Sequence, residues 1–397
     1  MKILLTHRYF WPDSSPYGAM LRTIGEGLAE AGHDVRVFTT KPSYREGVSA
    51  PGRERLAGMD IRRIGVLPEQ KGRPLTRALN VLLFCVPLFF QVLRQRPDVV
   101  TSATFPPIFE GLVTALAARL VGARMIYHLQ DIHPELSEHA GGFMGRKPLA
   151  GIFRWLDTLT LKRASAVVAL SGDMADTLRA RPGQSGLNVN VINNFALDAF
   201  DNRGTIPAEL AKPEGVTRII FAGNLGRFQN VPLLADGVGL RLEKHKKVEL
   251  LLLGDGVMLS DLKARWGTHP QVRFHPFIPF ADAQEVIRQA DIGLVSLAPG
   301  VFRVSYPSKV LTYLALGLPM LAWWLRGRGE GVAQYGTEFW MVNPYDPAQG
   351  TIGVFGLLPR IVENASSYVF EHGPAGIVGA GGPALSTIGV VLALVAL

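Results

Sequence analysis

The chain has 397 residues, of which 48% are hydrophobic and 19% charged, and this composition excludes a disordered or fibrous protein. Its length exceeds what one hydrophobic core usually supports, so two domains are expected. The single cysteine, Cys85, excludes an internal disulfide and points to a reducing compartment. The net charge of +8 favours anionic partners such as nucleotide sugars or anionic lipid. Because no nucleic-acid-binding motif accompanies that charge, we expect no nucleic-acid partner.

The first half of the chain predicts a parallel sheet covered by helices. The N-terminal apolar run is short and is followed by His7 and Arg8, which indicates a buried strand and no signal peptide, and so a cytoplasmic protein. Short apolar runs then alternate with stretches of helical periodicity. The predicted strands are 2–6, 35–39, 98–103, 124–129 and 166–170, and the predicted helices are 20–28, 109–121 and 149–162.

Two charge-poor stretches interrupt this pattern. Residues 79–93 carry Phe84, Phe89 and Phe90 but no charge, and arginines flank them at positions 73, 77, 94 and 96. The run is too short to span a bilayer, and Pro87 interrupts it. It is either a buried helix or a helix lying in a membrane interface, and the flanking arginines favour the interface. Residues 373–397 also lack charge, and the sequence leaves open a tail anchor, a packed helix or an aberrant reading-frame end.

The second half repeats the α/β pattern after a polar stretch over 198–213. The predicted strands are 218–222, 248–253, 272–275, 292–297 and 320–324, and the predicted helices are 231–243, 258–266, 281–289 and 308–316. We therefore predict an N-terminal domain over 1–196, a C-terminal nucleotide-binding domain over 197–350, and a C-terminal helix and apolar tail over 351–397. Two doubly wound domains leave a cleft, and ligands bind at the carboxyl ends of such strands.

Polar residues gather after the fourth predicted strand of the first domain. His128 lies near the end of this strand, and Asp131 and Glu135 follow it, all within the segment YHLQDIHPE; such groups can orient sugar hydroxyls or transfer a proton. Alternatively, Asp131 caps a turn and His128 is a satisfied core residue. The loop before the first helix ends at Gly18, where a helix N-terminus could meet a phosphate. No G-x-G-x-x-G motif is present, which argues against a dinucleotide-binding dehydrogenase.

The second domain carries glycines and cations at successive strand ends. Glycine lets the backbone approach a diphosphate, and lysine, arginine and a helix start supply positive charge. The residues predicted to bind the donor in this domain are Gly223, Asn224, Arg227, Gly254, Gly256, Pro307, Ser308 and Lys309.

The ordered set of motifs resembles glycosyltransferase family 4, in its branch that builds bacterial exopolysaccharides and surface glycans. The resembling segments are YFWPD at 9–13, GHDV at 32–35, RPDVV at 96–100, QDIHPE at 130–135, AGNLG at 222–226, GDG at 254–256, ADIGL at 290–294, PSK at 307–309 and LALGLP at 314–319. The resemblance covers roughly residues 1 to 325 and does not extend to 373–397.

The resemblance implies a GT-B fold, in which two Rossmann-like domains face a central cleft. It implies transfer of a hexose-type sugar with retention at the anomeric carbon, without metal or cofactor. The donor would be a nucleoside diphosphate sugar, with Lys309 and the Gly223-Asn224 turn facing its diphosphate. His128, Asp131 and Glu135 would face the sugar or a glycan or lipid-linked acceptor. Such an enzyme would act in the cytoplasm, peripherally at the inner face of the membrane.

The chain departs from the family at three places. Val304 and Thr312 stand where many members carry two glutamates. Asn224 and Gln229 replace an arginine and a lysine, and Ser15-Pro16 replaces a double glycine. Two alternatives to a transferase therefore stay open, namely a non-catalytic nucleotide-sugar-binding partner of another transferase and a nucleotide-sugar epimerase.

Overall fold

A computed structural model describes the chain except for residues 14, 44–48, 69–73, 140, 198–203, 232–241, 243–245, 299 and 325–397. Most of the predicted helix over 231–243, the start of the predicted linker and the whole of 351–397 therefore lie outside the described residues. The chain divides into two compact units. Among the described residues, unit 1 comprises Met1–Thr205, Pro279–Asp282 and Val301–Thr312, and unit 2 comprises Ile206–Ile278, Ala283–Gly300 and residues 313–324.

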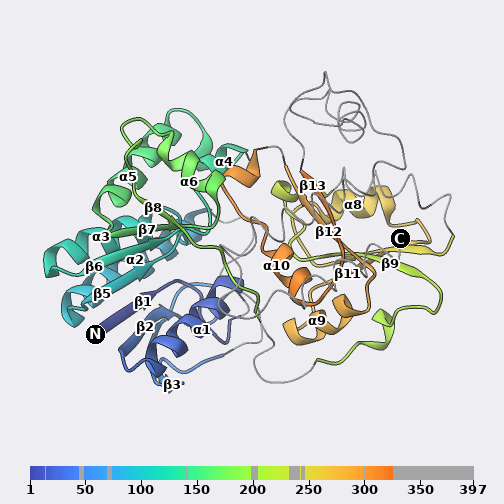
Figure 1. The fold of residues 1–397 in the computed structure, drawn as a ribbon, viewed down its shortest axis with the longest axis horizontal. Helices are drawn as coiled ribbons and strands as arrows, with labels where there is room; N and C mark the ends of the chain where they lie inside the picture. The colour runs from blue at the N-terminus through green and yellow to red at the C-terminus, as the bar shows by residue number, and fades with distance from the viewer. Residues whose placement is uncertain are drawn as a thin grey trace, which may run out of the picture. The chain divides into compact units, whose positions relative to one another are not determined.

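Unit 1 is built on an eight-stranded sheet in the order β3-β4-β2-β1-β5-β6-β7-β8 (Figure 1). Its strands are β1 (Lys2–Thr6), β2 (Asp34–Thr40), β3 (Arg53–Leu56), β4 (Met59–Ile64), β5 (Val99–Ser102), β6 (Arg124–His128), β7 (Ala166–Ala169) and β8 (Val189–Val191). All neighbouring strands are parallel except β3 and β4. Connections between parallel strands need a crossover, and helices supply most of them here.

The helices of unit 1 begin and end where local side chains and glycines dictate. They are α1 (Pro16–Glu30), α2 (Pro74–Gln95), α3 (Phe109–Val121), α4 (Glu135–His139), α5 (Leu149–Arg163) and α6 (Gly172–Arg179). The Ser15 hydroxyl caps α1 by accepting from the Gly18 N–H at 3.5 Å, and the Ser171 hydroxyl caps α6 by accepting from Met174 N–H at 3.2 Å. Gly122 ends α3 in the left-handed conformation that glycine adopts without strain.

Unit 2 carries a five-stranded parallel sheet in the order β11-β10-β9-β12-β13 (Figure 1). Its strands are β9 (Thr217–Ala222), β10 (Val248–Leu253), β11 (Val272–His275), β12 (Ile292–Leu297) and β13 (Met320–Trp324), with helices α8 (Leu259–Trp266), α9 (Phe280–Arg288) and α10 (Ser308–Ala315). The near-continuous apolar run of β10 is typical of a strand covered on both faces. The strands predicted for this half of the chain are confirmed to within a residue at each end.

Three strands of unit 1, namely β3, β4 and β8, were not predicted from the sequence. The β3–β4 hairpin was not predicted, because β3 alternates exposed charges with partly buried residues and β4 interrupts its buried Met59 and Ile61 with charged residues. Its turn, Ala57-Gly58, has positive φ at both positions, the conformation that two-residue hairpins prefer. The short edge strand β8 was also not predicted, since two of its three residues are exposed.

Helix α2 differs as well. It runs through Pro87 for 22 residues, longer than the charge-free run that predicted it. By length and composition its Leu75–Gln95 stretch could cross a membrane, with a mean hydropathy of 1.7, but a third of it is buried within the unit. Phe84 is fully buried and stacks on Phe38 with ring centroids 5.8 Å apart, so this residue belongs to the core and not to an interface.

Candidate active site

The strand order of unit 1 reverses direction beside β1. The chain leaves β1 toward β2 on one side and later returns to β5 on the other, so the loops after β1 and β5 diverge. Ligands of doubly wound sheets bind at such a switch point, outside the carboxyl ends of the strands. His7 follows β1, Glu110 lies in the first turn of α3, the helix that follows β5, and His128 ends the neighbouring strand β6.

His128 sits in a buried cluster with one ring nitrogen unused. Its Nδ1 lies 3.1 Å from the Tyr17 hydroxyl, and Tyr17 also contacts the His7 ring edge-on at 4.8 Å between centroids. Its Nε2 is buried and has no hydrogen-bond partner among the described residues. Burial lowers the pKa of His128 to about 4 and contributes most to lowering the pKa of His7 to about 3. Both rings are therefore neutral at pH 7, and Nε2 of His128 is a polar atom suited to a ligand.

Glu110 completes this cluster from the start of α3. Its Oε1 accepts from the Thr6 hydroxyl at 2.9 Å, and its Oε2 lies 3.9 Å from Nδ1 of His7. Because the side chain is fully buried, desolvation raises the pKa of this carboxyl well above its usual value. Sequence reasoning missed His7, Tyr17 and Glu110, which are far apart in the chain. A polar residue directly after a buried strand is the signal that could have found His7, whereas Tyr17 and Glu110 lie within helices α1 and α3.

Asp131 joins the loop after β6 to a segment from late in the chain. Its Oδ1 accepts from the Ser305 hydroxyl at 2.5 Å, and the two residues form a backbone bridge. The Ile132 N–H donates to the Val304 carbonyl at 2.7 Å, and the Thr177 hydroxyl donates to the Arg303 carbonyl at 2.9 Å. These bonds explain why residues 301–312 belong to unit 1.

Val304 and Lys309 occupy that late segment. Val304 is buried, so an apolar packing contact stands at the first of the two positions where glutamate was expected from the family pattern. Lys309 is the second residue of α10, and desolvation lowers its pKa to about 8. Ser308, the first residue of α10, is exposed, and Pro307 precedes it at the helix start.

Glu135 is held in a buried ionic network. Its Oε2 accepts from Nη2 of Arg181 at 2.7 Å, and its Oε1 accepts from Nε of Arg181 and of Arg154. Arg181 also donates to Asp157 at 2.6 Å, and Asp157 accepts a second bond from the Tyr127 hydroxyl. Although burial alone would raise the pKa of Glu135, the two arginines hold it below its usual value. Both oxygens of Glu135 are therefore engaged by protein groups.

Contacts within unit 1 also account for the presence of His133 and Gly18 at their positions. The His133 carbonyl accepts from Arg181 at 2.9 Å, and burial is the largest cause lowering the pKa of its imidazole. A Cβ on Gly18 would lie 2.8 Å from the Tyr9 carbonyl oxygen, so the first turn of α1 needs glycine to approach the loop after β1.

In unit 2, glycines allow the loop after β9 and the loop after β10 to approach each other closely. Gly223 and Gly254 have φ values of +133° and +151°, and a Cβ on Gly254 would lie 1.9 Å from the Gly223 oxygen. A Cβ on Gly256 would lie 2.3 Å from the Leu225 oxygen. These glycines are therefore required by the close approach of the loops, whatever ligand they face.

The same loops present polar groups at the carboxyl edge of the unit 2 sheet. Asn224 and Arg227 are exposed, and a Cβ on either Gly226 or Gly256 would lie 2.8 Å from the Asn224 amide. Glycine at both positions thus leaves room for that side chain. The Tyr313 hydroxyl accepts from the Ala222 N–H at 3.0 Å at the end of β9.

Two family models match consecutive parts of the chain. The glycosyl transferase 4-like domain matches residues 17–194, and the glycosyl transferases group 1 domain matches residues 216–358. The chain belongs to glycosyltransferase family 4. Among curated proteins it is similar to the probable glycosyltransferase WbjE of Pseudomonas aeruginosa, with 25% identity covering 75% of this chain and 78% of that one.

A second relative and a solved structure agree with this assignment. The putative colanic acid biosynthesis glycosyl transferase WcaI of Escherichia coli K12 is 24% identical, over 80% of this chain and 82% of the relative. The structure of Anabaena HepE in complex with UDP and glucose superposes with a TM-score of 0.56 and 18% identity, covering 92% of this chain and 100% of that one. The two Rossmann-like units of this glycosyltransferase are those of the GT-B fold.

The predicted site residues of the glycosyltransferase fall into two groups. His128, Asp131, Glu135, Gly18 and the segment Pro307–Lys309 all belong to unit 1. The remaining donor-binding candidates, namely Gly223, Asn224, Arg227, Gly254 and Gly256, all belong to unit 2.

The Arg181 network predicts a large stability effect. Replacing Arg181 with leucine leaves the buried carboxylates of Asp157 and Glu135 without their shared cation, so unfolding should become easier by about 3–5 kcal/mol. Denaturant titration measures this change. The control is Arg179→Leu, which removes an exposed ion pair with Asp176 and should cost less than about 1 kcal/mol. Equal losses in the two variants would contradict the structural role of the network.

Proposed function

We propose that this glycosyltransferase moves a hexose from a nucleoside diphosphate sugar to a glycan or lipid-linked acceptor during synthesis of a surface polysaccharide. The relatives support the pathway class, since WcaI is described as a colanic acid enzyme. HepE, whose structure holds UDP and glucose, supports the donor class. The observation that carries the proposal is the unsatisfied, buried Nε2 of His128 at the switch point of unit 1.

The chemistry proposed for the site is electrostatic. When the anomeric C–O bond breaks, negative charge develops on the leaving diphosphate, and fixed positive groups stabilise it. Lys309 at the start of α10 supplies a cation, and in unit 2 the Gly223-Asn224 turn, Arg227 and the Gly254–Gly256 loop supply N–H donors and charge. We propose that the acceptor oxygen adds with retention at the anomeric carbon and that no metal takes part.

The polar residues of unit 1 divide into two roles in this proposal. His128 offers its neutral imidazole to a sugar hydroxyl, and Asp131, oriented by Ser305, faces the sugar or the acceptor. Glu135 was expected to do the same, but its engagement by Arg154 and Arg181 supports a positioning role. It would hold the loop that carries Asp131.

Removal of the His128 imidazole tests the proposed function. His128→Ala should lower turnover of a UDP- or GDP-hexose by about 10²- to 10³-fold, the range for removing one preorganised hydrogen-bonding group at the reacting centre. Donor consumption is measured with EDTA present, which also tests metal independence. The control is His139→Ala, which changes an exposed histidine on α4. Wild-type turnover in His128→Ala, or total loss of wild-type activity in EDTA, would refute this assignment.

The shifted pKa of Lys309 predicts a pH dependence. Its ammonium is charged below pH 8 and loses its proton above it, so donor kcat/KM should fall as pH rises from about 7 to 9. The charge-assisted bonds lost are worth about 1.5–3 kcal/mol, or about 10- to 100-fold. Lys309→Arg keeps its charge throughout and should abolish the fall, whereas Lys309→Ala should be low at every pH. A profile unchanged in both variants would exclude Lys309 from the donor site.

We further propose that unit 1 docks on the inner face of a membrane through α2. The buried side of this helix is fixed by Phe84 and by Asn80, whose amide bonds both the N–H and the carbonyl of Leu67 at 2.9 Å. The opposite side is a stripe of exposed apolar residues, the α2 stripe, consisting of Leu75, Leu79, Leu82, Leu83, Val86 and Phe90. A stripe of this spacing, with Arg77, Arg94 and Arg96 at its ends, suits a helix lying in the interface.

Vesicle binding tests the α2 stripe. Changing Leu82, Val86 and Phe90 together to serine should weaken binding to anionic vesicles by at least roughly tenfold, because each apolar side chain contributes about 1.5–3 kcal/mol when buried. Co-sedimentation gives the binding curve, and turnover of the donor in solution should persist. Val257→Ser, which alters an exposed apolar residue of unit 2, is the control. Equal binding by the triple variant and the wild type would show that the stripe does not contact lipid.

A further inference from the structure

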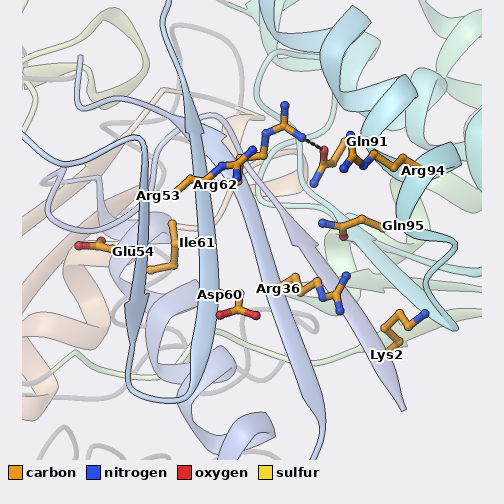
Figure 2. A pocket seen from close by; sticks show the side chains of 10 residues that line it. All are labelled: Lys2, Arg36, Arg53, Glu54, Asp60, Ile61, Arg62, Gln91, Arg94 and Gln95. Carbon is orange, nitrogen blue, oxygen red and sulfur yellow. Dashed lines mark hydrogen bonds between the residues drawn. The ribbon is translucent and has the colours of Figure 1, made fainter.

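A cavity of about 630 Å³ opens on unit 1 where α2 ends beside strands β1 to β4 (Figure 2). Its described lining contains two carboxylates, Glu54 and Asp60. It also contains five cationic side chains, those of Lys2, Arg36, Arg53, Arg62 and Arg94. We call this cavity the basic pocket. The excess of positive charge in one concave site attracts anions.

The charge of the basic pocket is only partly neutralised, because Asp60 is the one lining carboxylate that no other described residue engages. Glu54 is engaged on the other face of the hairpin by Arg63 at 2.6 Å, and Figure 2 shows it pointing away from the cations. Arg36 pairs with Asp34 at 2.9 Å, and Arg62 donates to the neutral amide of Gln91. Within the part of the chain that the structure describes, neither Arg53 nor Arg94 forms an ion pair.

Two of these arginines are forced together by the sheet. Arg53 and Arg62 lie directly opposite one another on the antiparallel β3–β4 ladder, and their side chains share a face. Like charges in this position repel and destabilise the pair of strands. A bound dianion placed between the two guanidinium groups would turn this repulsion into attraction, with the bidentate geometry that arginine offers to phosphate.

The basic pocket is separate from the candidate active site. Lys2 begins β1 and lines the pocket, whereas His7 follows the end of the same strand. Five residues of extended chain span about 17 Å at roughly 3.3 Å per residue. The pocket therefore lies toward the amino ends of β1 and β2, away from the edge that carries His128.

The α2 stripe ends at this pocket. Phe90, which is 62% exposed, directly precedes Gln91 of the pocket lining, and Val86 lies one turn earlier on the exposed side. A phosphate-binding pocket at the end of an apolar stripe matches a phosphodiester headgroup joined to acyl chains. A soluble phosphate compound offers the same anion without the acyl chains.

We propose that the basic pocket is a second ligand site, which binds a phosphate group with Arg53 and Arg62 as its principal contacts. Phosphate binding at this site does not depend on the transfer reaction or on the nucleotide-sugar donor. A membrane phospholipid and a soluble phosphate are the two possible sources of the group, and each has its own arm in the test.

The test uses the full chain with Arg53→Gln and Arg62→Gln combined, and Arg55→Gln as the matched control. Arg55 is an exposed arginine on the same strand that does not line the pocket. One arm titrates inorganic pyrophosphate calorimetrically in a Lys309→Ala background, so that the donor site contributes little. The other arm compares vesicles of phosphatidylglycerol with vesicles of phosphatidylcholine.

The double variant should bind at least tenfold more weakly than the Arg55→Gln control in one arm or both. A loss with phosphatidylglycerol alone identifies a lipid headgroup, and a loss with pyrophosphate alone identifies a soluble ligand. The denaturation midpoint should stay equal or rise, because a repulsive pair has been removed, and this separates lost binding from lost folding. Equal affinities of the double variant and the control in both arms would overturn the proposal, as would a wild-type chain that binds neither probe.

Discussion

The bonds between Arg181 and its two carboxylate partners are the interaction on which the site of unit 1 depends. Glu135 begins α4, Asp157 lies within α5, and Arg181 follows α6, so one guanidinium ties three helical segments together. The same guanidinium donates to the His133 carbonyl and so holds the loop between β6 and α4. A planar, permanently charged group with five donors can do this, whereas a lysine could not satisfy all of these acceptors. Asp131 lies in the loop that this anchoring holds, whereas His128 is placed by the pairing of β6 with β7.

The strands of both sheets could be predicted because their cause is local. Val248–Leu253 or Lys2–Thr6 can be recognised from a short apolar run bounded by polar residues, and neither needs knowledge of its neighbours. The hairpin of β3 and β4 could not be recognised in this way, because charged residues interrupt the apolar residues Leu56, Met59 and Ile61 that pack into the core. Likewise α2 was predicted from its charge-free centre, but its true ends and the burial of Phe84 depend on the sheet beneath it.

The candidate site shows the same division. The sequence pointed to the loop that carries His128, Asp131 and Glu135, because polar residues clustered there. It could not show that Glu135 is engaged by an arginine 46 residues away, or that Tyr17 lies 3.1 Å from His128 across 111 residues. The glycines of unit 2 add a further ambiguity. Gly254 is required by a backbone contact whatever ligand it faces, so a glycine pattern alone does not show that a diphosphate binds there.

The bridge between Asp131 and Ser305 has a consequence for how the chain is made. Residues 301–312 are part of unit 1, yet the ribosome synthesises them after residues 206–278 and 283–300 of unit 2. Until residue 305 has emerged, the Ile132 N–H and the Asp131 carboxylate lack the partners that they have in the finished protein. Domains commonly fold from the N-terminus as they are translated, but here the loop that carries Asp131 must wait. A fragment cut after the first sheet would therefore keep its core and lack a completed site.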